Sequence, residues 1–123
     1  MLKIQCITID CQDPIAMAHF WANVLGWKIG DGATDNEAFI EKNISDSNPD
    51  GYPDLLFIKT ADVKINKNRV HLDLRPDDQL AEVQRLEQMG ATRIEIGQSE
   101  DPDTTWVVMA DPEGNEFCVL RAL

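Results

Sequence analysis

Basic residues are scarce in this sequence. It has 11 lysines and arginines against 22 aspartates and glutamates, and a formal net charge of −11. Such a chain repels a phosphate backbone and has no basic stripe with which to bind one, so we predict no nucleic-acid partner. The same field would attract a cationic ligand, although an acidic surface also serves solubility alone.

Long apolar runs are missing as well. No stretch approaches the roughly 20 apolar residues needed to cross a bilayer, so we predict no membrane partner. The first ten residues alternate like a strand and lack the apolar stretch and cleavage site of a signal peptide. Only three cysteines are present, an odd number that fits reduced thiols better than a disulfide framework. Together these features predict a cytoplasmic location.

The chain of 123 residues suits one domain with its own core. Its apolar periodicity predicts the order strand, helix and three strands, and this order occurs twice. The first set occupies 2–11, 14–25, 27–29, 37–41 and 54–60, with a loop at 43–53. The second occupies 69–75, a helix that opens at 76–78 and runs to 89, then 93–96, 105–110 and 116–121. We interpret the pattern as a divergent internal duplication.

The two strands that open the halves each have a polar face. In 69–75, Val70 and its apolar alternates are expected to pack on a core, because side chains two apart on a strand share a face. The other face of that strand holds His71, Asp73 and Arg75. The corresponding face of the first strand holds Cys6, Thr8 and Asp10. These faces are either a candidate site or, alternatively, solvated surface, since polar faces of open sheets are often simply exposed.

A repeated βαβββ unit is combined here with Phe20-Trp21 and Leu25-Gly26 at the end of the first helix and with an Asp-Pro-Glu-Gly-Asn-Glu-Phe-Cys-Val-Leu segment from Asp111. This combination resembles the vicinal oxygen chelate superfamily, in particular the glyoxalase-like domains related to glyoxalase I, bleomycin-resistance proteins and extradiol dioxygenases. The resemblance implies an α+β fold in which tandem βαβββ modules, 1–62 and 68–123 of a single domain 1–123, form curled mixed sheets around a ligand-binding cup. The motifs are specific for the fold and weak for the reaction.

Metal-dependent members of this superfamily take ligands from four strand positions, and the resemblance places three of them on Cys6, His71 and Cys118. The fourth falls on Leu55, or on Phe57 if the register slips by two residues. Neither hydrocarbon side chain can bind a cation, so we predict no metal. The alternative is a zinc site made of the two thiolates and the imidazole.

The candidate site follows from these faces and from the implied cup. We predict that His71 acts as the catalytic acid or base. A thiolate of Cys6 or Cys118 beside His71 is an alternative nucleophile. The predicted ligand-binding residues are Cys6, Thr8, His71, Asp73, Arg75, Trp106, Glu116 and Cys118.

Three functions remain open at this point. The chain is a lyase or isomerase acting on a small oxygenated metabolite, a metal-free protein that sequesters a cationic or aromatic drug, or an accessory module. No cofactor is predicted, because Gly30-Asp31-Gly32 does not follow a phosphate-binding pattern and no glycine-rich loop opens either helix. We predict a homodimer, because the short strands have edges that need covering and because the resemblance implies pairing of modules across a two-fold axis.

Overall fold

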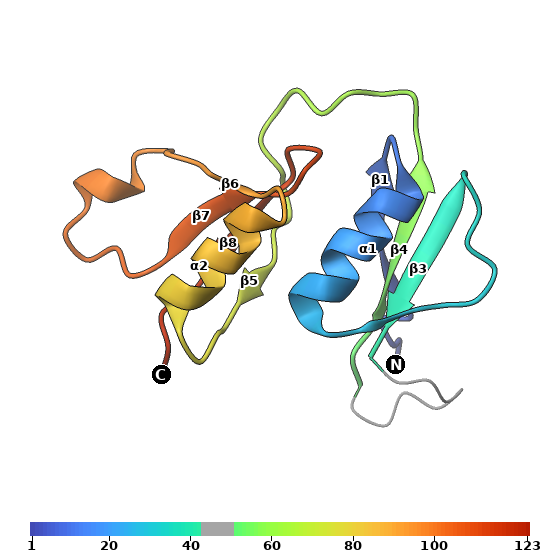
Figure 1. The fold of residues 1–123 in the computed structure, drawn as a ribbon, viewed down its shortest axis with the longest axis horizontal. Helices are drawn as coiled ribbons and strands as arrows, with labels where there is room; N and C mark the ends of the chain where they lie inside the picture. Colours follow the sequence, from blue (N-terminus) through green and yellow to red (C-terminus); the bar gives the residue numbers. More distant parts are fainter. Residues whose placement is uncertain (43–50) are drawn as a thin grey trace. The chain divides into compact units, whose positions relative to one another are not determined.

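The computed structural model describes residues 1–42 and 51–123, and the chain forms two compact units, Met1–Val63 and Lys64–Leu123 (Figure 1). The segment 64–67, which the sequence analysis leaves between its two modules, belongs to the second unit. Most of the loop predicted at 43–53 lies outside the described residues, and 51–53 have no regular secondary structure. No helix in the described ranges is both long and apolar enough to span a membrane.

The first unit contains one helix and a four-stranded mixed sheet. Its elements are β1 (Cys6–Cys11), α1 (Pro14–Leu25), β2 (Lys28–Ile29), β3 (Glu37–Glu41) and β4 (Asp54–Lys59). The strand order is β1-β4-β3-β2, with β1 and β4 parallel and the other pairs antiparallel.

The second unit repeats this topology. Its elements are β5 (Asp73–Leu74), α2 (Gln79–Gln88), β6 (Thr92–Arg93), a 3₁₀-helix (Gln98–Glu100), β7 (Val107–Ala110) and β8 (Glu116–Val119). The strand order is β5-β8-β7-β6, again with the outer first strand parallel to the last. The same order in both halves supports the interpretation as an internal duplication, and the predicted α+β class with tandem βαβββ units and mixed sheets is confirmed.

The two helices begin in the same way. The Asp13 carboxylate accepts a hydrogen bond from the Ala16 amide at 3.1 Å, and the Asp78 carboxylate accepts one from the Ala81 amide at 3.0 Å. Each bond satisfies an amide that the first turn of a helix leaves without a partner. α1 ends at Gly26, whose positive φ of 68° suits a residue without a side chain.

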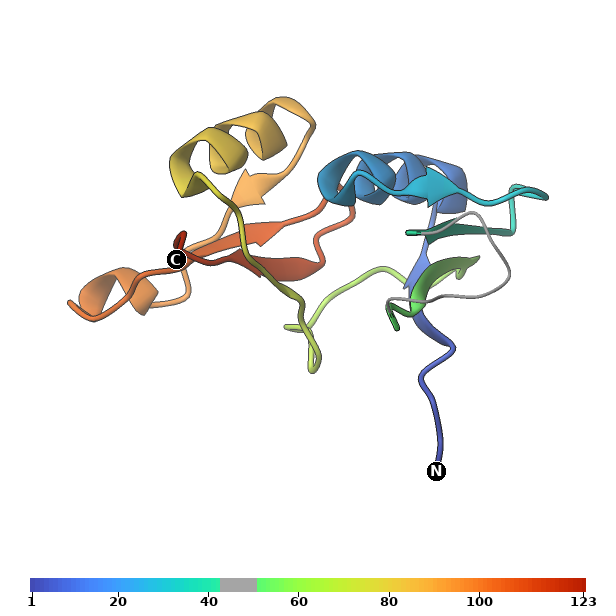
Figure 2. The same cartoon turned by 90° about the horizontal axis from the view of Figure 1, so that it is seen from below.

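One face of each sheet is covered by its helix, as Figure 2 shows most clearly. In the first unit α1 packs on β3 and β4, and in the second α2 packs against β6. The largest fully buried side chains are Met17, Ile40 and Phe57 in the first unit, and Val83, Leu86, Met109, Phe117 and Val119 in the second. Gly30 is required by close packing, because a Cβ atom there would collide with the Phe39 ring.

Several predicted strands are too long: besides the two described next, 93–96 is replaced by Thr92–Arg93, 105–110 is reduced to Val107–Ala110 and 116–121 to Glu116–Val119. The chain before Cys6 is not a strand, and Leu2 and Ile4 are exposed. The strand predicted at 69–75 is reduced to Asp73–Leu74, and the prediction that Val70 packs on the core is wrong, since it is 77% exposed. The physical reason is that β5 has one neighbour, β8, and the Glu116 carbonyl at the start of β8 accepts from the Asn68 side chain.

Candidate functional site

The candidate site lies where β5 runs parallel to β8 in the second unit. Asp73 pairs with Cys118, and the Cys118 amide donates to the Leu72 carbonyl at 2.9 Å. Paired residues of a parallel ladder project on the same side of the sheet. The ladder therefore brings the polar face of the β5 segment beside the Cys118 side chain.

The turn before β8 sets the position of that strand. The carboxylate of Asp111, which is only 3% exposed, accepts from the amides of Glu113 and Asn115 at 2.9 and 3.0 Å. Its second oxygen accepts from the Asn115 side chain at 3.0 Å. Gly114 supplies the positive φ of 92° that the turn needs. The Asp111 carboxylate thus holds this turn together at the entry into β8.

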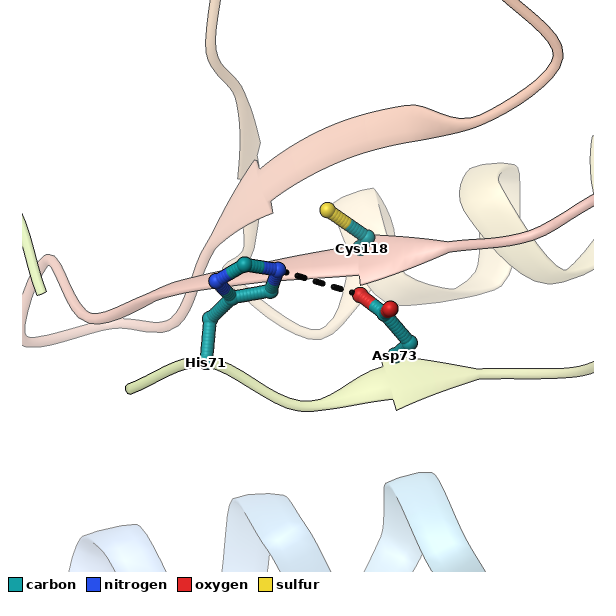
Figure 3. A group of neighbouring side chains, drawn as sticks. All are labelled: His71, Asp73 and Cys118. Carbon is teal, nitrogen blue, oxygen red and sulfur yellow. Dashed lines mark ion pairs between the residues drawn. The ribbon is translucent and has the colours of Figure 1, made fainter. Parts of the chain in front are cut away.

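His71, Asp73 and Cys118 form a cluster (Figure 3). Nε2 of His71 and Oδ1 of Asp73 are 3.2 Å apart, and the ligating atoms of all three residues lie within 4.8 Å of one another. The two β5-side groups are about half exposed, whereas Cys118 is buried. An exposed pair of this kind contributes little to stability. A ligand can therefore contact the imidazole and the carboxylate without a large cost to the fold.

The Cys118 side chain is a protonated thiol rather than a thiolate at neutral pH. Burial raises the pKa of this thiol, the negative charge of Asp73 and a hydrogen bond with it raise the pKa further, and Lys67 acts in the opposite sense. A thiol held in this form is a poor nucleophile. The geometry brings Cys118 close to His71, as the nucleophilic alternative requires, but the electrostatics do not favour nucleophilic catalysis.

Glu116 fixes a wall of the site. Its carboxylate accepts from Nζ of Lys64 at 2.9 Å and from the Asn68 amide at 3.0 Å. Burial by itself would raise the pKa of Glu116, but the hydrogen bonds from Lys64 and Asn68 together with the Lys64 charge outweigh it, so the pKa is lowered. The segment 64–68 is thereby held against the start of β8.

A pocket of about 400 Å³ opens at this place. Of the eight predicted ligand-binding residues, five line it: His71, Asp73, Trp106, Glu116 and Cys118. The other six lining residues are not among those predicted: Lys67, Asn68, Ile96, Val108, Phe117 and Leu120. Val108 carried a usable signal, because the predicted strand at 105–110 alternates and places it on the same face as Trp106.

Three predicted site residues lie elsewhere. Arg75 does not line the pocket, because its guanidinium donates to the Arg121 carbonyl at 2.7 Å. Cys6 and Thr8 are exposed on β1 in the first unit, where the Cys6 sulfur lies 3.9 Å from the Thr8 hydroxyl. All lining residues of the pocket come from the second unit.

The donor chemistry decides which metal ions the cluster suits. It offers one imidazole, one carboxylate and one thiol. Hard ions such as Mn²⁺ prefer oxygen-rich sets, which this is not, whereas zinc accepts all three donor types. The carboxylate is already paired with the imidazole, and the thiol is protonated. The set therefore does not fit a hard divalent ion, and zinc is the ion left to test.

The two residues to which the resemblance assigned a fourth metal-ligand position, Leu55 and Phe57, do not share a face of the sheet with Cys6. Leu55 and Phe57 are 3% and 0% exposed and alternate with the less buried residues of β4. On the Cys6 face, the ladder between β1 and β4 instead places Asp54 opposite Cys6 and Leu56 opposite Thr8. Leu55 and Phe57 therefore lie on the opposite face of the sheet from Cys6.

Taken together, the tandem βαβββ topology and a pocket over the sheet beside the last strand define a protein of the vicinal oxygen chelate fold. A family profile described as "Glyoxalase-like domain" matches residues 6–120, and the chain belongs to this family. No curated protein sequence matches the chain.

Solved structures agree on the fold. The chain is similar to a glyoxalase/bleomycin resistance protein/dioxygenase family enzyme from Burkholderia phytofirmans, with 19% identity and a TM-score of 0.69 over 99% of this chain and 100% of that one. A glyoxalase-related enzyme from Fulvimarina pelagi has 16% identity and a TM-score of 0.66, over 98% and 88% of the two chains. A mutant of the fosfomycin resistance protein FosX from Listeria monocytogenes, complexed with Mn(II) and a dihydroxypropylphosphonic acid, has 12% identity and a TM-score of 0.70, over 100% and 92%.

Proposed function

We propose that this glyoxalase-like protein binds a small organic molecule in the pocket of the second unit and does so without a metal ion. The observation that carries the proposal is the pocket itself: about 400 Å³, lined by the His71–Asp73 pair and by Trp106. Ligand sites are typically cavities of about 300–1,000 Å³ in which a few polar groups orient a ligand against apolar walls.

The reaction we propose is that of a lyase or isomerase acting on a small oxygenated metabolite. An imidazole can take up or release a proton in the physiological range, and Asp73 fixes the orientation of the His71 ring. The thiol of Cys118 remains protonated beside them and can donate a hydrogen bond to a ligand oxygen. His71 would transfer the proton, Asp73 would orient the His71 ring, and Cys118 would position the ligand.

A screen of metabolites and drugs by thermal shift tests the binding proposal, because a ligand that binds only the folded state raises the melting temperature. Hits are then measured against His71→Ala, with His19→Ala as the matched control, since His19 is exposed on α1. We expect the first variant to lose binding at nearly unchanged stability and the control to keep it. Equal binding by both variants would remove His71 from the site.

Sequestration of an aromatic drug is a second candidate, favoured by Trp106, which is 37% exposed at the pocket and offers a ring face. Product formation separates the two functions. NMR spectra of a bound hit show whether it is converted into a product. We expect an enzyme to convert the hit and the His71→Gln variant to lose this conversion, whereas a sequestering protein would leave the compound unchanged.

The metal-free state is tested by elemental analysis of protein purified without a metal-binding tag, followed by titration with zinc, nickel and manganese. We expect less than about a tenth of an equivalent of any of them, since at least three good donors are needed for a tight site. About one equivalent of zinc, lost in Cys118→Ser, would return the protein to the metal-dependent branch of its superfamily.

Homodimerisation and a cytoplasmic location are further parts of the proposal. Ile65 and Val70 expose apolar side chains in the segment before the short edge strand β5, and a second copy would cover them. A monomer mass in sedimentation at micromolar concentration would contradict the dimer. The three cysteines, all in the described ranges, form no disulfide, as expected for a reducing compartment.

A further inference from the structure

The charged groups that line the pocket differ in whether they already have a partner. Asp73 is 3.2 Å from His71, and Glu116 is 2.9 Å from Lys64. Lys67 lines the same pocket, and within the described part of the chain its ammonium makes no ion pair and no side-chain hydrogen bond. Both carboxylates of the pocket are thus engaged, and the group with unused hydrogen-bond donors is a cation.

Because the carboxylates are paired and the ammonium is not, a ligand of one charge sign binds at a lower free-energy cost than a ligand of the other. A cationic ligand that paired with Asp73 or Glu116 would have to compete with His71 or with Lys64. An anionic ligand would meet an ammonium whose three donors are available. The local preference is therefore opposite to the one suggested by the net charge of −11 for the whole chain.

Polar and apolar groups are also separated across the sheet. The strand order β5-β8-β7 puts Asp73 opposite Cys118 and Cys118 opposite Val108, so that the three form one row. The polar groups come from β5, the segment before it and β8, whereas the β7 side contributes Val108 and Trp106, and Ile96 adds a further apolar group. A ligand that spans the row needs a polar head and an apolar body.

Two interactions hold the apolar side in place. Nε2 of Gln79 donates to the Thr105 carbonyl at 2.9 Å, next to Trp106. The Ile96 amide donates to Oε1 of Gln98 at 2.7 Å. Trp106 and Ile96 are 37% and 49% exposed, so their side chains can lose further solvent contact when a ligand binds.

We propose that the ligand is an amphipathic organic anion, an aromatic carboxylate in its simplest form, with its carboxylate at Lys67 and its apolar body on Trp106 and Val108. The inference rests on the proposed function and narrows its ligand class. In this inference Lys67 selects the charge of the ligand. The sequence gives no signal for this role, because Lys67 lies in a polar connector without periodicity.

The experiment compares three probes that share one aromatic body: naphthylacetate, naphthylacetamide and naphthylethylammonium. Calorimetry gives the affinities, and the indole resonance of Trp106 in NMR spectra reports whether each probe occupies this pocket. We expect the anion to bind about tenfold more tightly than the amide, the ammonium to bind most weakly, and the difference to shrink as salt is added.

The matched variants are Lys67→Met and Lys3→Met, which change the net charge equally, while Lys3 lies outside the second unit. Lys67→Met should reduce the affinity for the anion to that for the amide, Lys67→Arg should restore it, and Lys3→Met should leave it unchanged. Equal binding of all three probes, or tightest binding of the ammonium, would overturn the anion inference and leave the pocket as a binding site. If none of the three shifts the Trp106 resonance while a hit from the thermal-shift screen does, the anion inference is contradicted and the proposed function stands; if no hit shifts it either, the proposed function is contradicted.

Discussion

Replacing Glu116 with glutamine tests how the pocket wall is built. The carboxylate is 16% exposed and accepts one hydrogen bond at each oxygen, from Lys64 at 2.9 Å and from the Asn68 amide at 3.0 Å. Glutamine has nearly the same shape but one acceptor oxygen and no charge. It can satisfy one of the two donors, and it presents an amide group to the other.

The expected loss of stability follows from this count. A hydrogen bond to a charged group contributes about 1.5–3 kcal/mol, and the partly exposed Lys64 can recover part of this from water. We expect Glu116→Gln to lower the free energy of unfolding by about 1–2 kcal/mol, which corresponds to a melting temperature lower by roughly 4–8 °C. Ligand binding should weaken as well, because Lys67 and Asn68 belong to the segment that Glu116 holds.

The same variant makes a prediction about pH. The pKa of Glu116 is lowered from 4.5 in the folded protein, so the folded state holds this proton less tightly than the unfolded chain. Its stabilisation is complete above pH 4.5 and is lost as the pH falls through the lower folded value. The stability difference between the parent protein and Glu116→Gln should therefore be largest at neutral pH and shrink in acid.

Urea unfolding followed by circular dichroism measures both effects. Glu100→Gln is the matched control, since Glu100 is exposed and belongs to the same unit. If the two variants unfold at the same urea concentration, or if the effect of Glu116→Gln does not change between neutral and acid pH, the proposed anchoring by Glu116 is refuted.

Two further predictions concern reactivity and packing. Iodoacetamide at mildly alkaline pH should modify exposed Cys6 well before buried Cys118. Asp73→Asn should speed the reaction of Cys118, because it removes a charge that raises the pKa of this thiol. Peptide mass spectrometry measures both rates, and equal rates for Cys6 and Cys118 would contradict the expected order. Phe57→Ala should cost about 3–5 kcal/mol in urea unfolding because Phe57 is 0% exposed, whereas Val63→Ala, at a position of the same unit that is 66% exposed, should stay within about 0.5 kcal/mol, and similar losses would show that the core assignment is wrong.

Local signals predicted most of the fold. The helix starts predicted at 14 and at 76–78 lie at or next to the observed starts of α1 at Pro14 and α2 at Gln79, and an aspartate before each helix satisfies an amide within its own turn. The strand at 69–75 was overpredicted for the opposite reason. Alternation shows that a strand can form, but only a paired neighbour makes it a strand, and β8 offers partners to Leu72 and Leu74 but none to Val70.

The site was predictable where it follows the period of a strand and unpredictable where it depends on contacts distant in sequence. His71 and Asp73 were predicted from the alternation in 69–75 and Cys118 from the family resemblance, and the ladder between β5 and β8 pairs Asp73 with Cys118. Lys67 lies in a connector without periodicity, and it reaches the pocket because a glutamate 49 residues later holds its neighbours. Arg75 has the right period, but its guanidinium is satisfied by the carbonyl of Arg121.

The duplication explains why one scaffold can carry different chemistry in its two halves. The central row of the second sheet consists of Asp73, Cys118 and Val108. The topologically equivalent row of the first sheet consists of Thr8, Leu56 and Phe39. Backbone pairing is the same in both rows, so the sheet itself does not require the acid, the thiol or the histidine two residues before the acid. The first row lacks a titratable group and needs none to fold, which is the reason to assign the polar residues of the second row to a ligand rather than to stability.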